Sequence, residues 1–133
     1  MRLLLDTHIW LWSVLERERL TARVRAALAD PDTELWVSPI STWELLLLVE
    51  RGRYGRLAGV PPGRAAEDAL AAGPFREASI THAIAQASRH VALPHHDPAD
   101  RFLVATARVL DLQLVTADAT IIRARQCKVL PNL

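Results

Sequence analysis

The sequence is poor in cysteine, lysine and aromatic residues, and it lacks a long apolar segment. A single cysteine, Cys127, among 133 residues excludes an internal disulfide and a thiolate zinc cluster. The longest uncharged apolar run lies around 45–49, far below the ~20 residues that cross a bilayer. The apolar N-terminus is interrupted by Asp6 and His8, and no cleavage site of small residues follows. We therefore expect a cytoplasmic protein with no membrane segment and no secretory leader.

Half of the residues are apolar, so the chain has enough material for a core and is not of the disordered class. The length predicts one domain over residues 1–133. The chain has sixteen basic residues, fifteen of them arginine, and fifteen acidic residues, so its net charge is +1. A modestly basic surface around an acidic site would suit a polyanionic substrate, but a coding bias toward arginine explains the composition better.

Apolar runs alternate with helical patterns along the whole chain. The predicted strands cover residues 2–5, 34–37, 76–80, 113–116 and 128–130. The predicted helices cover residues 7–15, 21–29, 41–51, 64–72, 81–90 and 97–110. Residues 52–63 hold four of the five glycines and two prolines, which is typical of a loop. This alternation predicts an α/β fold with a central, mostly parallel sheet flanked by helices.

Two aspartates follow predicted strands, at the edge where ligands bind in such sheets. Asp6 comes directly after the first strand, and Asp118 lies two residues beyond the strand that ends at Thr116. Aspartate at these positions is also a common helix cap. Each residue alone is therefore better explained as a cap than as a ligand.

Glu44 and Asp100 lie near the starts of predicted helices. Ser41 and Glu44 have the spacing of a capping box, but Glu44 sits in an apolar helix where an unpaired carboxylate is costly. Asp97 precedes Pro98 and is expected to cap the next helix, whereas Asp100 shares the apolar stripe of that helix and is expected to point inward. Four gathered carboxylates would repel one another unless they are protonated or bind a cation. Oxygen ligands without cysteine favour Mg²⁺ or Mn²⁺.

These motifs together resemble the PIN-domain family, and within it the VapC-type toxins of bacterial toxin–antitoxin pairs. The resemblance runs from Arg2 to about Leu130 and rests on four ordered segments: Leu-Leu-Leu-Asp-Thr-His, Ser-Thr-Trp-Glu, Asp-Pro-Ala-Asp-Arg and Leu-Val-Thr-Ala-Asp. It implies a metal-dependent ribonuclease that uses Mg²⁺ or Mn²⁺. The implied catalytic and metal-binding residues are Asp6, Glu44, Asp100 and Asp118.

The resemblance also implies supporting residues and partners. Thr116 matches a small hydroxyl residue two positions before the last acid, where it would support the site, and Asp97 competes with Asp100 for the place of the third acid. His95 and His96 run straight into Asp97, where relatives often place another residue, so the local loop geometry is open. The implied partners are an RNA substrate, a cognate VapB-like antitoxin that blocks the acidic site, and a second copy in a homodimer.

Several residues beside these motifs have competing explanations. Arg51, Arg53 and Arg56 flank the glycine-rich loop and either bind the RNA backbone or form a solvated edge. Trp10, Trp12 and Trp43 are better explained as core or dimer contacts than as base-stacking platforms. His8 either touches the substrate or packs, and packing explains it better. His90, His95 and His96 are expected at the surface.

Two other function classes remain open from the sequence. In a non-catalytic protein-binding module, the acids would be helix caps and the apolar helices a partner surface. A receiver or phosphatase domain also gathers acids at strand ends. That class requires adjacent acids or an Asp-x-Asp motif after the first strand, and the sequence has neither at Asp6.

Overall fold

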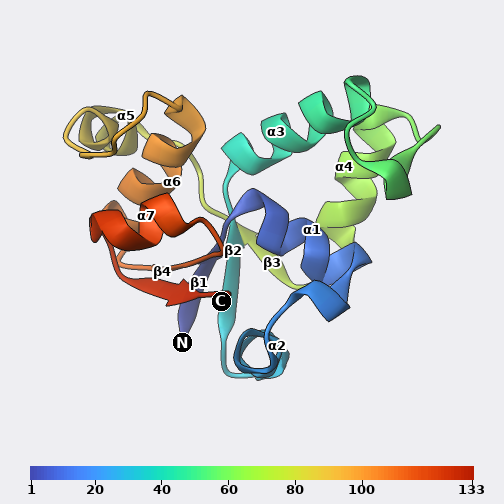
Figure 1. The fold of residues 1–133 in the computed structure, drawn as a ribbon, viewed down its shortest axis with the longest axis horizontal. Helices are drawn as coiled ribbons and strands as arrows, with labels where there is room; N and C mark the ends of the chain where they lie inside the picture. The colour runs from blue at the N-terminus through green and yellow to red at the C-terminus, as the bar shows by residue number, and fades with distance from the viewer.

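The computed structural model describes all 133 residues as one helix–sheet–helix sandwich (Figure 1). Its sheet has five strands in the order β3-β2-β1-β4-β5, and every neighbouring pair is parallel. The predicted α/β fold with a mostly parallel sheet is therefore confirmed. The strands are β1 Arg2–Leu5, β2 Glu34–Val37, β3 Phe75–Glu77, β4 Gln113–Thr116 and β5 Val129–Pro131.

Helices cover both faces of the sheet. In Figure 1, α1, α2 and α4 lie on one side and α5, α6 and α7 on the other, with α3 rising from the carboxyl end of β2. The α-helices are α1 Thr7–Leu15, α2 Ala22–Ala29, α3 Pro39–Glu50, α4 Pro62–Ala71, α5 His82–Ser88, α6 Pro98–Val109 and α7 Ala119–Ala124. Two 3₁₀ turns, η1 Arg17–Arg19 and η2 Gly55–Leu57, complete the chain. No helix is long and apolar enough to cross a membrane.

After the exposed Arg2, the central strand β1 is apolar because both of its faces are covered. Leu3 and Leu5 are fully buried in the core cluster that α1 and α2 complete. Leu4, which points the opposite way, is fully buried in the cluster of α5, α6 and α7. β1 is thus fixed between two cores, and Asp6 follows it at the carboxyl edge of the sheet.

Helix α3 begins earlier than the sequence pattern indicates. Ser38 caps it by accepting the Ile40 amide, and Pro39 occupies the first turn. The predicted capping box of Ser41 and Glu44 is wrong, because Ser41 already lies inside the helix and its amide donates to the Ser38 carbonyl. The expected burial of this helix is also wrong in part: only Ser41 and Leu45 are buried.

Other boundaries differ from the prediction at the short elements. β3 is displaced toward the N-terminus and stops at Glu77, and α4 already begins at Pro62, so Gly63 is helical rather than part of a loop. Helix α7 has six residues and was not predicted, because so short a segment shows no clear 3.6-residue period.

The segment between α3 and α4 is attached to the turn after α1. The Tyr54 hydroxyl donates a hydrogen bond to the Glu16 carboxylate. Arg56 forms ion pairs with Glu16 at 3.5 Å and with Glu18 at 3.5 Å. These contacts anchor the glycine-rich segment beside η1.

Candidate functional site

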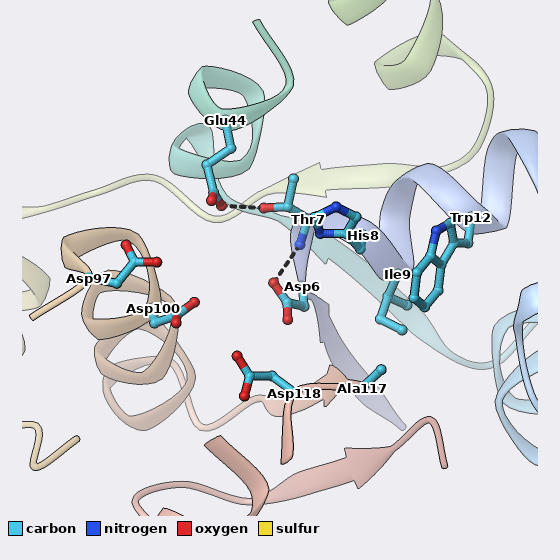
Figure 2. Close-up of a pocket in the computed structure, with 10 residues that line it drawn as sticks. All are labelled: Asp6, Thr7, His8, Ile9, Trp12, Glu44, Asp97, Asp100, Ala117 and Asp118. Atoms are coloured by element: carbon cyan, nitrogen blue, oxygen red, sulfur yellow. Dashed lines mark hydrogen bonds between the residues drawn. The ribbon is translucent and has the colours of Figure 1, made fainter. Parts of the chain in front are cut away.

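Five carboxylates line one pocket at the carboxyl edge of the sheet, which we call the acidic pocket: Asp6, Glu44, Asp97, Asp100 and Asp118. The pocket has a volume of about 330 Å³, and its wall also includes Thr7, His8 and Trp12. Figure 2 shows the side chains turned toward a common space from β1, α3, α6 and the segment after β4. The fold therefore brings together the four acids that the resemblance names as catalytic, together with Asp97, the competing candidate for the third acid.

Asp6 is fixed by two donors at the point where β1 becomes α1. Its Oδ1 accepts the Thr7 amide at 2.7 Å, and its Oδ2 accepts the Thr116 hydroxyl at 2.6 Å. Burial raises the pKa of Asp6, although the Thr116 and Thr7 hydrogen bonds oppose this change. Asp6 is thus a rigid, largely desolvated carboxylate whose negative charge is costly.

Asp118 occupies the matching position after β4. Its Oδ1 accepts the Thr120 amide at 2.8 Å and so caps α7. Its own amide donates to Thr116 Oγ1 at 3.0 Å. Thr116 therefore contacts both Asp6 and Asp118 through its hydroxyl oxygen.

Glu44 projects from the second turn of α3 toward α1. Its Oε1 accepts the Thr7 hydroxyl at 2.6 Å, a contact between residues 37 positions apart. Burial raises the pKa of Glu44, and the charges of Asp6 and Asp97 raise it further. The carboxylate is therefore directed into the pocket instead of back to its own helix end.

Both candidates for the third acid line the pocket from the start of α6. Asp97 caps the helix by accepting the Ala99 amide at 3.0 Å. The Asp100 side chain is 15% exposed. Burial raises the pKa of Asp100 to about 7, with further contributions from the charges of the other four carboxylates. Neutralising the other carboxylates would therefore favour the ionised form of Asp100.

A histidine outside the predicted site contacts Asp100. His95 Nε2 lies 3.3 Å from Asp100 Oδ2, while His95 Nδ1 accepts the Asp97 amide at 3.2 Å. Arg101 holds this loop by donating to the carbonyls of Val91 and His95. The sequence shows these residues as neighbours, but not that the loop folds His95 back onto the helix.

The donor set of the acidic pocket fits a hard divalent cation. Its charged ligands are all carboxylates, and burial and mutual repulsion raise the pKa of Asp6, Glu44 and Asp100. No three His, Cys, Asp or Glu side chains lie close enough as positioned to hold one ion together. Direct binding would therefore draw the carboxylates inward, or water would complete the coordination.

The remaining predicted residues divide between the pocket margin and other surfaces. Arg56 is occupied by Glu16 and Glu18, whereas Arg51 and Arg53 are exposed and line a second hollow beside the acidic pocket. His8 is exposed at the pocket wall, and it packs only on the side of Trp12, with the ring centroids 5.9 Å apart.

Of the four tryptophans, the three that the sequence singles out differ in environment. Trp10 is fully buried in the core, as expected, and Trp12 lines the acidic pocket. Trp43 is 49% exposed and so is not a core residue. Of the three histidines expected at the surface, His90 and His96 are exposed, whereas His95 is half-buried and contacts Asp100.

Comparisons with known proteins agree with this fold. Similar solved structures include VapBC2 from Rickettsia felis bound to a promoter DNA fragment, with a TM-score of 0.72, 14% identity and 98% of both chains covered. FitAcB from Neisseria gonorrhoeae gives a TM-score of 0.68 at 20% identity, covering 98% of this chain and 97% of that one. VapBC-1 from nontypeable Haemophilus influenzae gives 0.67 at 16% identity, with 98% of both chains covered.

Because the sequence identities are low, these similarities show the fold alone. No curated protein matches the chain in sequence. The family model of the PIN domain matches residues 3–126, which is nearly the whole chain. The protein therefore belongs to the PIN domain family.

Proposed function

We propose that the protein is a divalent-metal-dependent endoribonuclease that hydrolyses RNA phosphodiester bonds and serves as the toxin of a toxin–antitoxin pair. One observation carries the proposal: carboxylates from four separate parts of the chain line a single pocket at the carboxyl edge of the sheet. A cluster of this kind raises its own proton affinity and is stabilised by a shared cation. Membership of the PIN domain family is consistent with that chemistry.

Asp6, Glu44 and Asp100 are the residues proposed to hold the ion directly, and Asp118 does so directly or through water. Mg²⁺ or Mn²⁺ at this place would lower the pKa of a bound water and neutralise charge on the phosphate. Thr116 orients Asp6 through its hydroxyl hydrogen bond. Asp97 holds the start of α6 and adds negative charge to the same wall of the pocket.

The proposed partners are a cognate VapB-like antitoxin and a second copy of this chain, in the cytoplasm. The similar solved structures support the antitoxin, because they include VapBC and FitAB proteins and a toxin–antitoxin complex from Klebsiella pneumoniae. An inhibitor that covers the acidic pocket would keep the nuclease inactive in the cell that makes it.

Digestion of a labelled single-stranded RNA by the purified protein tests the nuclease. We expect cleavage with Mg²⁺ or Mn²⁺, none with EDTA, and none with the Asp6→Asn variant. Asparagine caps a helix about as well as aspartate, so this substitution removes a charge and keeps the cap. Asp32→Asn, at an exposed position, is the matched control and should cleave like the unmodified protein. Cleavage that persists in EDTA, or in Asp6→Asn, contradicts the proposal.

A non-catalytic protein-binding module is the second candidate. It is favoured by the fact that Asp6, Asp97 and Asp118 each cap a helix. In that case no RNA is cleaved under any condition, and Asp6→Ala lowers the free energy of unfolding by about 1 kcal/mol through loss of the cap. Metal-dependent cleavage by the unmodified protein excludes this candidate.

A further inference from the structure

One face of α3 carries an exposed tryptophan followed by cationic side chains. Trp43, Leu47 and Arg51 are spaced four residues apart, so they follow one another along a single face of the helix. Trp43 is among the few large apolar side chains left exposed, at 49%. Arg56 and Arg64 are held in ion pairs, but Arg51 and Arg53 form none. This face therefore offers an aromatic surface and two free guanidinium groups.

The end of α3 holds the two arginines next to each other. Gly52 has a φ of +62°, and the Arg53 amide donates to the Leu48 carbonyl at 2.8 Å. This 6→1 bond with a left-handed glycine is the pattern of a Schellman motif. It turns the chain back at once, so Arg53 stays beside the last turn of the helix.

This face continues into the acidic pocket. A hollow of about 140 Å³ is lined by Trp43, Leu47, Leu48, Arg51 and Arg53, and it shares His8 and Glu44 with the acidic pocket. An RNA strand with one phosphate in the acidic pocket would therefore contact α3 with its neighbouring nucleotides. We call the face formed by Trp43, Leu47, Arg51 and Arg53 the α3 track.

We propose that the α3 track binds the nucleotides next to the scissile phosphate of a single-stranded RNA. A base stacks on the Trp43 indole, and Arg51 and Arg53 bind backbone phosphates. The proposal rests on the nuclease function proposed above and assigns its substrate-positioning surface. Aromatic faces combined with cationic groups are how proteins bind single strands without requiring a fixed sequence.

Charge favours RNA over a second copy of the chain on this face. In a two-fold dimer each surface meets its own copy, so unpaired arginines on the α3 track would tend to face one another. The only acidic group lining the same hollow is Glu44, whose Oε1 is bonded to Thr7. A polyanion meets no such repulsion from Arg51 and Arg53.

Fluorescence anisotropy of a labelled 12-nucleotide single-stranded RNA, measured in EDTA so that cleavage does not intervene, tests the α3 track. We expect Trp43→Ala to weaken binding roughly 5- to 150-fold without changing its salt dependence, because a base contact is lost. Trp43→Phe should retain most of the affinity. Arg51→Gln with Arg53→Gln should weaken binding and lower the slope of log K against log salt by about 1.4, for two phosphate contacts.

Arg23→Gln with Arg89→Gln is the matched control, because both arginines are exposed and removing them changes the net charge equally. The control should bind RNA like the unmodified protein. Equal RNA affinity of Trp43→Ala and the unmodified protein overturns the proposal. It is also overturned if the arginine control loses as much RNA affinity as the variant with Arg51→Gln and Arg53→Gln. Loss of a dimer in Trp43→Ala, seen by light scattering, also overturns it and assigns the face to a second copy.

The outcome for the α3 track is separate from the outcome for the nuclease. Trp43-dependent RNA binding without metal-dependent cleavage keeps the track and rejects the nuclease. Asp6-dependent cleavage together with unchanged RNA binding by Trp43→Ala keeps the nuclease and rejects the track. Circular dichroism of each variant confirms that the fold is intact.

Discussion

The Thr116 hydroxyl is hydrogen-bonded to Asp6 Oδ2 at 2.6 Å, across the adjacent ends of β4 and β1. The same oxygen accepts the Asp118 amide at 3.0 Å, so its own hydrogen is directed to Asp6. One fully buried side chain therefore links the two strand-end aspartates. It also supplies a hydrogen bond that stabilises the ionised form of Asp6.

Thr116→Val should disturb both aspartates without a large change of volume. The substitution removes the donor to Asp6 and leaves the Asp118 amide without an acceptor, so the free energy of unfolding should fall by about 1–3 kcal/mol. It should also raise the pKa of Asp6 further and lower nuclease activity. Urea denaturation at pH 7 measures the stability. Thr116→Ser keeps the hydroxyl and should retain activity; equal loss in both variants would contradict the hydrogen-bond argument.

The metal-free protein should become less stable as the pH rises from about 4 to 7. Native Asp100 has a pKa near 7, whereas the unfolded group titrates near 3.8, so the native state holds more protons between these values. Asp6 and Glu44 change in the same direction. The Asp100 contribution is at most about 4 kcal/mol.

Denaturation in EDTA across this pH range, compared between the unmodified protein and Asp100→Asn, isolates that contribution. Asp100→Asn should lose less stability between pH 4 and 7, because the substituted group does not ionise. Parallel curves for the two proteins would show that Asp100 is not held at a raised pKa.

His95 should assist cation binding through Asp100, although it is not placed among the ligands. Its Nδ1 accepts the Asp97 amide, so the neutral ring carries its hydrogen on Nε2, 3.3 Å from Asp100 Oδ2. Groups that orient a ligand in this way typically change metal affinity 10- to 100-fold. We expect His95→Ala to bind Mn²⁺ 10- to 100-fold more weakly than the unmodified protein, as measured by electron paramagnetic resonance.

His96→Ala is the matched control, because the neighbouring His96 is exposed. It should bind Mn²⁺ like the unmodified protein, and His95→Gln should recover part of the affinity. A similar loss in the His95 and His96 variants would assign the effect to the loop as a whole.

Much of the fold could be predicted because its signals are local. The apolar run of β1 ends at Asp6, and Thr21 and Asp97 cap the helices that the sequence assigns to them. The capping box at Ser41 failed because Ser38 and Pro39 supply a competing start three residues earlier. Both candidate starts have suitable residues, and spacing alone does not distinguish them.

The acids of the candidate site could also be predicted, since parallel strands end at one edge of a sheet. The contacts that tune those acids could not. The bond from Thr7 to Glu44 and the approach of His95 to Asp100 depend on how α1, α3 and the loop before α6 pack. The exposure of Trp43 is likewise a result of packing, because an apolar helix such as α3 can be covered on either side.

A Mn²⁺ titration of the metal-free protein, followed by calorimetry, tests the cation site of the acidic pocket most directly. The unmodified protein and Asp32→Asn should bind Mn²⁺ with equal affinity, and Asp6→Asn should bind at least about tenfold more weakly, because a buried charged ligand is lost. No Mn²⁺ binding by the unmodified protein, or undiminished binding by Asp6→Asn, would contradict the assignment of these carboxylates to a metal-dependent nuclease.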